Sequence, residues 1–396
     1  MKVLSVFGTR PEAVKMAPVV QQLSRTPGVE ARTCVTAQHR EMLDQVLSLF
    51  DIRPDYDLDL MRPDQSLAEL SAAIFTRLDA VLADFQPHWI LAQGDTTTVA
   101  ITSLLAYYRR IHFGHVEAGL RTYDKWQPFP EEINRRVAGV IADLHFAPTE
   151  QARQNLLREG VPDDIIQVTG NPVIDALNVV AGQPLPQEIT HLLAKLRIES
   201  NRVESDSRRE NCSPAPKRQA VNKPAARRLV LVTAHRRENF GQPLENICHA
   251  LAQLAARGDV EIIYPVHLNP HVQEPVKRIL GHTDHITLLP PLDYLPLVHL
   301  EKRATLILTD SGGIQEEAPA FGVPVLVLRE VTERPEGVTA GVLKLVGTDT
   351  ARIVSEATRL LDDPIAHARM AKAVNPFGDG HAAQRIVQAL TSFSCR

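Results

Sequence analysis

Short apolar runs of strand character alternate with amphipathic stretches along this chain, and this alternation restricts its fold more than any other feature. In the first half, the strand-like runs are Val3–Phe7, Glu30–Thr36, His88–Gln93, Ile111–Val116 and Leu144–Ala147. Near-continuous apolar strands separated by helices are typical of a parallel sheet that helices cover on both faces. The first half therefore predicts a doubly wound α/β domain.

The same alternation starts again after residue 228. Its strand-like runs are Leu229–Val232, Val260–Tyr264, Ile286–Leu289, Thr305–Leu308 and Val325–Leu328. Because 396 residues exceed the size at which a single hydrophobic core stops growing, two domains are expected. We place one Rossmann-like domain at residues 1–172 and a second at 173–375, and we expect a final helix, 376–396, to pack back on the first domain.

Residues 199–228 interrupt the alternation. This segment is polar and highly charged, contains prolines and has few large apolar side chains. Such a composition cannot bury enough apolar surface to offset the entropy of ordering. We interpret the segment as a flexible surface insertion in the second domain, and the alternative is a docking segment for a partner.

Composition argues against several classes of function. The net charge of -4 gives no reason to expect nucleic acid as a partner. No apolar run reaches the length that spans a bilayer, and the N-terminus lacks the cleavage site of a signal peptide. The cysteines at 34, 212, 248 and 395 have neither disulfide nor metal-ligand spacing, which favours a reducing cytoplasm.

The segment Thr309–Glu317, TDSGGIQEE, has the character of an anion-binding loop. It follows an apolar run, so a strand, a glycine turn and a helix start occur in order. Gly312 and Gly313 let the backbone approach a ligand, while Ser311 and the first helical N–H groups can donate to a phosphate. With Glu317 one turn later available to a ribose diol, the predicted ligand is a nucleotide. The alternative is an ordinary strand-to-helix loop with Ser311 as N-cap.

The loop after the first strand carries cations where a dinucleotide-binding loop has glycines. Gly8 is its one glycine, so the fingerprint of a nicotinamide cofactor is absent. Arg10 and Lys15 lie about one helical turn apart, and we expect both to point to the carboxyl edge of the sheet. Their alternative role is that of solvated surface charges.

Three acids are predicted at the same edge of the first sheet. Asp95 and Glu117 follow two apolar runs, and Glu131 opens the next helical stretch. Clustered carboxylates raise one another's pKa, which can leave one as an acid and another as a base near neutrality. Alternatively, Asp95 is an N-cap and Glu131 a helix-dipole acid.

The second domain offers further anion ligands after its strands. His235 and two arginines follow the first of these strands, and Arg334 follows the last. We expect His235 and Arg334 to hold a diphosphate. His267 and His271 are four residues apart, but they have no acidic third ligand and Pro270 lies between them, so no metal site is expected.

Together these segments resemble the non-hydrolysing bacterial UDP-N-acetylglucosamine 2-epimerases. The resemblance covers nearly the whole chain apart from residues 199–228. Its motifs are FGTRPEAVKMAP, TAQHREMLDQVL, QGDTTT, GHVEAGLRT, PFPEEINR, TAHRREN, TDSGGIQEEAP and TERPE.

The resemblance implies a two-domain glycosyltransferase-B fold with a nucleotide sugar in the interdomain cleft. It implies that Ser311, Gly312 and Gly313 hold phosphate and that Glu317 holds ribose, with His235 and Arg334 nearby. From the first domain, Arg10 and Lys15 reach the diphosphate. Asp95, Glu117 and Glu131 surround the sugar.

The implied reaction is epimerisation at carbon 2 of UDP-N-acetylglucosamine, to supply UDP-N-acetylmannosamine for cell-surface polysaccharide. Elimination of UDP gives 2-acetamidoglucal, and re-addition inverts carbon 2. No cofactor is required, which acid is the base stays open, and a homodimer is expected. The rivals are a hydrolysing 2-epimerase, a glycosyltransferase of the same architecture and a non-catalytic nucleotide-sugar sensor.

Some members of this family bind a second substrate molecule as an activator beside the TAQHR segment. Gln38 and Arg237 match that pattern, but Glu41 and Asp64 are acids where neutral and basic groups are expected. Because two acids would repel a diphosphate, the sequence predicts that substrate activation is absent here.

Overall fold

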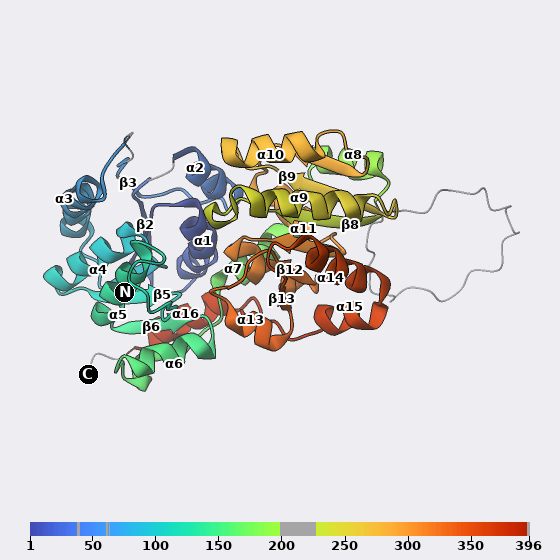
Figure 1. Cartoon of the computed structure of the whole chain (residues 1–396). Coiled ribbons are helices and arrows are strands. Elements are labelled where there is room, and N and C mark those ends of the chain that lie inside the picture. Colours follow the sequence, from blue (N-terminus) through green and yellow to red (C-terminus); the bar gives the residue numbers. More distant parts are fainter. Residues whose placement is uncertain (38–39, 61, 63, 199–226, 394–396) are drawn as a thin grey trace, which may run out of the picture. The chain divides into compact units, whose positions relative to one another are not determined.

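A computed structural model describes the chain apart from residues 38–39, 61, 63, 199–226 and 394–396, so most of the predicted insertion lies outside the described residues. The chain forms two compact units. Unit 1 contains residues 1–183, 333–340 and 374–396, and unit 2 contains residues 184–332 and 341–373. In each unit a parallel sheet is covered by helices (Figure 1), so the α/β class predicted from the strand–helix alternation is confirmed.

The sheet of unit 1 has seven strands in the order β3-β2-β1-β4-β5-β6-β7, all of whose pairings are parallel. Its strands are β1 (Lys2–Phe7), β2 (Glu30–Val35), β3 (Tyr56–Asp57), β4 (Trp89–Gln93), β5 (His112–Val116), β6 (Leu144–Ala147) and β7 (Ile166–Val168). Its helices are α1 (Arg10–Ser24), α2 (Arg40–Leu49), α3 (Leu67–Phe85), α4 (Thr97–Arg109), α5 (Glu131–Ile141), α6 (Glu150–Arg158), α7 (Pro172–Ala181), α13 (Pro335–Ala340) and α16 (Ala382–Ser392).

The sheet of unit 2 has six parallel strands in the order β10-β9-β8-β11-β12-β13. Its strands are β8 (Arg228–Thr233), β9 (Val260–Pro265), β10 (Ile286–Leu289), β11 (Leu306–Thr309), β12 (Val325–Val327) and β13 (Leu343–Leu345). Its helices are α8 (Gln187–Leu196), α9 (Gln242–Ala255), α10 (Pro270–Leu280), α11 (Tyr294–Glu301), α12 (Gly312–Glu317), α14 (Thr350–Asp362) and α15 (Pro364–Ala371). Short 3-10 helices are η1 (Asp163–Ile165) in unit 1, and η2 (Arg237–Asn239) and η3 (Ala318–Phe321) in unit 2.

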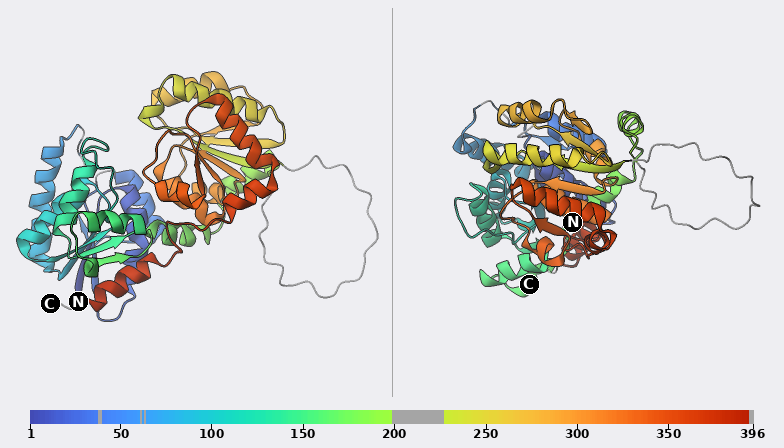
Figure 2. Two further views of the ribbon diagram at one scale, coloured as in Figure 1. Left: turned by 60° about the horizontal axis from the view of Figure 1, so that its bottom comes forward. Right: turned by 45° about the vertical axis from the view of Figure 1, so that its right-hand side comes forward.

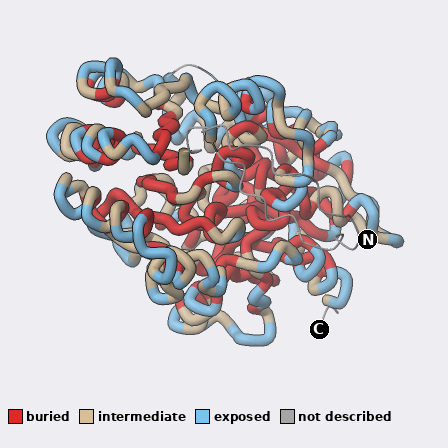
Figure 3. Tube along the Cα trace, turned by 90° about the vertical axis from the view of Figure 1, so that its right-hand side faces the viewer, coloured by how far each residue is buried: buried red, intermediate tan, exposed pale blue. Residues whose placement is uncertain are grey.

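The strands carry most of the core. The three central strands of unit 2 are almost wholly buried, and buried positions follow the strands while exposed positions follow the outer faces of helices (Figure 3). Because helices cover both faces of each sheet, strand side chains on both faces are excluded from water. The carboxyl ends of these strands then position the polar side chains that follow them.

Helices α7 and α16 are far apart in the sequence but both belong to unit 1. The C-terminal helix α16 packs against α1 and α7 (Figure 2, left). Asp175 of α7 accepts hydrogen bonds from the first amides of α16, Ala382 N at 3.1 Å and Ala383 N at 2.9 Å. The predicted end of the first domain is residue 172, but α7 lies within unit 1, whose first segment extends to residue 183.

Candidate active site

The first turn of α1 is fixed by Glu12. Its Oε2 accepts from the backbone amides of Gly8 at 3.0 Å and Thr9 at 2.7 Å, and its Oε1 accepts from the hydroxyl of Thr96 at 2.7 Å. Burial raises the pKa of Glu12, although these hydrogen bonds oppose the shift. Glu12 therefore joins the loops that follow β1 and β4, and it orients the first turns of α1, which carry Arg10 and Lys15.

Glu117 is held by three side chains at the end of β5. Lys15 Nζ lies 2.6 Å from Glu117 Oε1, and Asn171 Nδ2 donates to the same oxygen at 2.9 Å. Gln93 donates to Oε2. Burial alone would raise the pKa of Glu117, but the charge of Lys15, followed by that of Arg334 and the Asn171 bond, lowers it overall. The carboxylate is therefore ionised, and Lys15, which the sequence analysis assigned to a diphosphate, is paired with it.

The backbone of Glu117 adopts the left-handed conformation, with φ of 62°. A non-glycine residue with positive φ costs energy that the surrounding structure must offset, and such residues occur often at functional sites. Here the hydrogen bonds to both carboxylate oxygens help to hold the conformation. The strained backbone and the locked side chain together fix this carboxylate at the carboxyl edge of the sheet.

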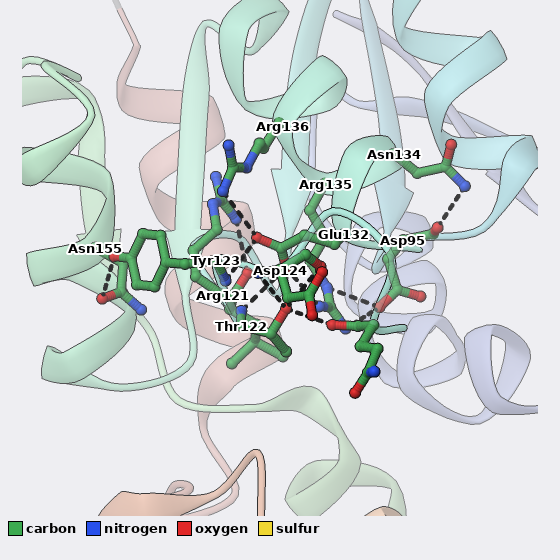
Figure 4. Close-up of polar contacts among 12 residues, drawn as sticks. Asp95, Arg121, Thr122, Tyr123, Asp124, Glu132, Asn134, Arg135, Arg136 and Asn155 are labelled. Atoms are coloured by element: carbon green, nitrogen blue, oxygen red, sulfur yellow. Dashed lines mark hydrogen bonds and ion pairs between the residues drawn. The ribbon is translucent and has the colours of Figure 1, made fainter. Parts of the chain in front are cut away.

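Asp95 pairs with an arginine of α5. Arg135 donates to Asp95 Oδ2 from Nε at 2.9 Å and from Nη2 at 2.6 Å (Figure 4). Asn134 Nδ2 donates to the main-chain carbonyl of Asp95 at 2.9 Å. The helix that follows is capped by Thr96, whose side chain accepts from Val99 N. The alternative of Asp95 as an N-cap is therefore wrong.

Glu131 and Glu132 begin α5 but differ in their surroundings. Glu132 is buried and accepts from the amides of Thr122 at 3.0 Å and Tyr123 at 3.1 Å, and from Arg135 and Arg136 (Figure 4). Burial raises the pKa of Glu132, but the two amides and Arg135 outweigh it, so the pKa is lowered. By contrast, Glu131 Oε2 is buried and has no hydrogen-bond partner among the described residues.

A layer of buried groups lies beneath these acids on β5 and β6. His115 and His145 are register partners on the two strands, and burial lowers their pKa values to about 4 and about 3. Both imidazoles are therefore neutral at physiological pH. Arg121 forms a bidentate pair with Glu159, both contacts being 2.8 Å, and its Nη2 lies 3.2 Å from where a Cβ at Gly139 would be.

Arg334 lies in the segment 333–340, which belongs to unit 1. The sequence analysis placed it in the second domain beside the candidate phosphate loop. Within unit 1, the hydroxyl of Thr149 donates to Glu336 Oε1 of α13 at 3.0 Å, and the charge of Arg334 contributes to the lowered pKa of Glu117. Arg334 thus belongs with the carboxylates of unit 1. Local sequence does not encode this long-range placement.

In unit 2, the predicted glycine loop connects β11 to α12. Ser311 is at the N-cap position, but its side chain makes no capping bond; its amide donates to the hydroxyl of Thr309 at 2.9 Å. The first N–H groups of a helix have no partner within the helix. Glu317 Oε1 lies 3.5 Å from where a Cβ at Gly313 would be, so this carboxylate is next to the turn.

His235 lies at the neighbouring strand end, because β8 pairs with β11 through Thr233 and Thr309. Asp310 Oδ2 accepts from the amides of His235 and Arg236, both at 2.8 Å, and from Asn239 Nδ2 at 3.0 Å. The His235 ring stacks on His267 with centroids 5.3 Å apart and planes at 6°. Asp310, which the sequence analysis did not single out, therefore fixes the loop that carries His235 beside Ser311.

Known proteins resemble this chain along nearly its whole length. Residues 21–391 match the family model for UDP-N-acetylglucosamine 2-epimerase. The chain is 55% identical to the UDP-N-acetylglucosamine 2-epimerase of Salmonella typhimurium over 394 residues, 99% of each chain. The chain belongs to the UDP-N-acetylglucosamine 2-epimerase family. The family predicted from the motifs is confirmed.

Solved structures of other members of the UDP-N-acetylglucosamine 2-epimerase family have the same fold. UDP-GlcNAc 2-epimerase from Neisseria meningitidis, bound to UDP-GlcNAc, is 45% identical, with a TM-score of 0.84 over 99% of this chain and all of the other. S. aureus MnaA, in a co-structure with UDP, is 44% identical, with a TM-score of 0.83 over 98% of this chain and 95% of the other.

Several structural observations bear on the other expectations. Within the described residues, no three potential metal ligands form a cluster, and none of the helices is both long and apolar enough to cross a bilayer. Cys34 and Cys248 are buried free thiols, and Cys212 and Cys395 lie outside the described residues. Gln38 also lies outside them and the side chain of Glu41 is not described, so the absence of activation stays a prediction.

Proposed function

We propose that this chain interconverts UDP-N-acetylglucosamine and UDP-N-acetylmannosamine by elimination and re-addition of UDP. The observation that carries the mechanism is the unequal state of the three acids in unit 1. Glu117 is paired with Lys15, Asp95 is paired with Arg135, and one buried oxygen of Glu131 has no hydrogen-bond partner among the described residues. Family membership supports the substrate, since relatives of this fold carry UDP-GlcNAc or UDP.

The chemistry requires both a base and stabilisation of a leaving diphosphate. The proton on carbon 2 has no neighbouring carbonyl to acidify it, so its removal must accompany cleavage of the bond between carbon 1 and the diphosphate oxygen. A carboxylate takes the proton, the electron pair forms the glucal double bond, and UDP leaves with the electrons of the broken bond. Protonation of the opposite face and re-addition of UDP invert carbon 2.

Glu131 is the acid best suited to be the base in this proposal. Its unpartnered oxygen can accept a proton without first breaking an ion pair. By contrast, both oxygens of Glu117 already accept hydrogen bonds, and Asp95 forms an ion pair with Arg135. Glu117 and Asp95 then orient the sugar hydroxyl and acetamido groups and stabilise developing positive charge at carbon 1.

We assign the diphosphate to donors at the strand ends of unit 2. The amides of Gly312 and Gly313, the hydroxyl of Ser311 and the ring of His235 would bind phosphate oxygens, and Glu317 would accept from the ribose diol. For Arg10, the first residue of α1, and for Arg334, both of which belong to unit 1, the role of a diphosphate ligand rests on the family resemblance alone.

The test is an isotope experiment on the full chain with UDP-N-acetylglucosamine. Epimerised product formed in heavy water is expected to carry deuterium at carbon 2. An oxygen label in the bridge between carbon 1 and the β-phosphate is expected to scramble into non-bridging positions. Product with neither deuterium nor scrambling would overturn the elimination, and release of free N-acetylmannosamine would indicate a hydrolysing enzyme.

A homodimer is the assembly that we propose, supported by exposed apolar side chains on two packed helices of unit 1. Tyr107 and Tyr108 of α4 are 68% and 66% exposed, and Val140 of α5 is 87% exposed. Exposed apolar groups on packed helices are typical of subunit interfaces. Light scattering is expected to give a dimer for the wild type and a monomer for Tyr108→Asp/Val140→Asp; a wild-type monomer would contradict the proposal.

The cellular setting is also a proposal. Buried free thiols at Cys34 and Cys248 are compatible with a reducing cytoplasm, and the product would be a precursor of cell-surface polysaccharide. Deletion of the gene is expected to abolish a polysaccharide that contains N-acetylmannosamine or a sugar made from it; an unchanged polysaccharide composition would argue against this role.

A further inference from the structure

Glu132, the second residue of α5, is a buried acid without a role in the proposed mechanism. Its side chain has 0% exposure, and its two oxygens accept from different loop amides, Oε2 from Thr122 N at 3.0 Å and Oε1 from Tyr123 N at 3.1 Å (Figure 4). Burial opposes ionisation, but these amides and the charge of Arg135 lower the pKa of Glu132. Glu132 is therefore an ionised carboxylate in a fixed position.

Arg135 is held between this carboxylate and a second one. Its Nη1 lies 3.2 Å from Glu132 Oε2, while its Nε and Nη2 donate to Asp95 (Figure 4). Residues three apart lie on the same side of a helix, so Glu132 and Arg135 meet without distortion of α5. The side chain of Arg135 is only 10% exposed. Protein groups rather than water therefore determine how its guanidinium is turned.

The main chain and the side chain of Asp95 are held by different residues. Asn134 Nδ2 donates to the main-chain carbonyl of Asp95 at 2.9 Å, which fixes the backbone. Arg135 Nε and Nη2 both donate to Oδ2, at 2.9 and 2.6 Å, so Arg135 occupies one carboxylate oxygen and leaves Oδ1 for the substrate. The rotation of the Asp95 carboxylate thus depends on Arg135, and the position of its backbone on Asn134.

We propose that Glu132 is a positioning residue for the reaction: it fixes the guanidinium of Arg135, which in turn orients the carboxylate of Asp95 toward the sugar. This inference rests on the proposed function, which places Asp95 at the sugar. Without the Glu132 carboxylate, Arg135 keeps its pair with Asp95 but is held from one side only. A small displacement of an orienting group lowers turnover more than it lowers ligand affinity.

The experiment is a double-mutant cycle on the full chain with UDP-N-acetylglucosamine as substrate. Glu132→Gln keeps the shape of the side chain, removes its charge and replaces one acceptor oxygen by a donor. It is expected to lower kcat by about tenfold. Because Glu132 acts through Arg135, the double variant Glu132→Gln/Arg135→Met is expected to have a kcat within about twofold of that of Arg135→Met.

Glu150→Gln is a matched control in the same unit. Glu150 is the first residue of α6 and pairs at 2.7 Å with Arg153, three residues later, but its side chain is 62% exposed. The control therefore removes the same kind of helical ion pair away from the acids, and wild-type kcat is expected. A loss in Glu150→Gln equal to that in Glu132→Gln would overturn the inference, since any such pair would then have the same effect.

Counting UDP-binding sites separates positioning from a purely structural role. Calorimetry with UDP gives the number of sites, and kcat is expressed per site, so that unfolded protein does not lower it. UDP affinity is expected to stay at the wild-type value throughout the cycle, because the donors assigned to UDP lie in unit 2. Fewer sites in Glu132→Gln with wild-type kcat per site would show a structural role alone and would overturn the positioning role.

A second variant covers the case in which Glu132→Gln does not fold. Glu132→Asp keeps the charge but withdraws the carboxylate by one methylene. It then takes the place of Glu132→Gln in the cycle, and the same lack of additivity with Arg135→Met is expected.

Two results of the cycle would overturn the inference and leave the proposed function intact. One is wild-type kcat in the Glu132 variant. The other is losses that multiply, with the double variant about tenfold below Arg135→Met, since Glu132 would then act independently of Arg135. Wild-type product with neither deuterium at carbon 2 nor scrambled oxygen would instead overturn the proposed function, and this inference with it.

Discussion

The acids at the strand ends of unit 1 are held differently from Asp310 and Glu301 of unit 2. In unit 1, Glu117 and Glu132 are surrounded by cations and donors that lower their pKa values, and Asp95 is paired with Arg135. In unit 2, Asp310 accepts mainly from backbone amides, and the buried Glu301 has a raised pKa and no hydrogen-bond partner among the described residues. Cations and donors thus favour the charged forms of Glu117 and Glu132 in unit 1, whereas burial favours the neutral form of Glu301 in unit 2.

The arrangement in unit 1 matches what this unit is proposed to do. A carboxylate that orients a sugar while positive charge develops must stay ionised, and paired cations keep it so. The two arrangements also respond to pH in opposite directions, so variants can separate them.

The largest effect is expected from the Lys15–Glu117 pair. Glu117→Gln is expected to lower turnover by about 10²- to 10⁴-fold. Lys15→Met leaves a buried charge without its nearest cation and is expected to cost about 3 kcal/mol of stability. The double variant should regain stability, measured by thermal unfolding, without regaining turnover. A double variant as unstable as Lys15→Met alone would show that the unpaired charge of Glu117 does not cause the loss of stability.

The two neighbouring arginines of α5 offer a matched comparison. Arg135 binds both Asp95 and Glu132 and is buried, while the side chain of Arg136 is 39% exposed and binds Glu132. Arg135→Met is expected to lower kcat by about tenfold or more, because Asp95 loses its orientation. Arg136→Met should change kcat by less than about threefold. Steady-state kinetics that give equal losses would refute the assigned role of Arg135.

Variants of Asp310 test whether its hydrogen bonds with backbone amides hold the loop that carries His235. Asp310→Asn removes a charged acceptor of three hydrogen bonds and is expected to weaken UDP binding by about tenfold. Asp293 is a suitable control, because it precedes α11, is exposed and makes no side-chain capping bond. Calorimetry should give wild-type affinity for Asp293→Asn. Unchanged affinity in Asp310→Asn would mean that the loop needs no such anchor.

The smallest effect concerns acid stability of unit 1, which contains both tryptophans, Trp89 and Trp126. The pKa values of Glu117 and Glu132 lie below their usual 4.5, so the unfolded chain binds more protons in acid. Their stabilisation is complete above about pH 4.5 and is lost as the pH falls through the lowered values. Tryptophan fluorescence should report this loss, and Glu132→Gln should reduce its dependence on pH. If Glu132→Gln leaves the acid unfolding transition unchanged, Glu132 does not contribute the expected stabilisation.

Much of the fold could be predicted from sequence, because long apolar runs bounded by turns identify buried strands. The strands β3, β7 and β13, with two or three residues each, were missed. Such short segments have no periodicity of their own, and pairing with neighbouring strands creates them. Asp95 and Glu117 could be predicted because each follows a strand, and parallel strands bring their carboxyl ends to one edge; Glu131 could be predicted as the first acid of a helix.

The partners of those acids were not accessible in the same way. Asn171 stands in a Gly-Asn-Pro sequence that indicates an N-cap, and its Oδ1 does accept from Val173 N at 3.1 Å. That its Nδ2 also reaches Glu117 depends on tertiary structure. Glu301 has the sequence character of an ordinary helical charge, and its complete burial depends on tertiary structure. The place of Arg334 in unit 1 is likewise a long-range result.

The helix α16 has a consequence for how the protein is made. Residues 374–396 belong to unit 1, although every residue of unit 2 precedes them. On the ribosome, the first unit to begin is thus the last to be completed, while unit 2 has all of its residues earlier. Until α16 emerges, the apolar surface of α1 and α7 that it covers stays open to solvent and to chaperones. A nascent chain that stalls after residue 373 would carry a complete unit 2 and an unfinished unit 1.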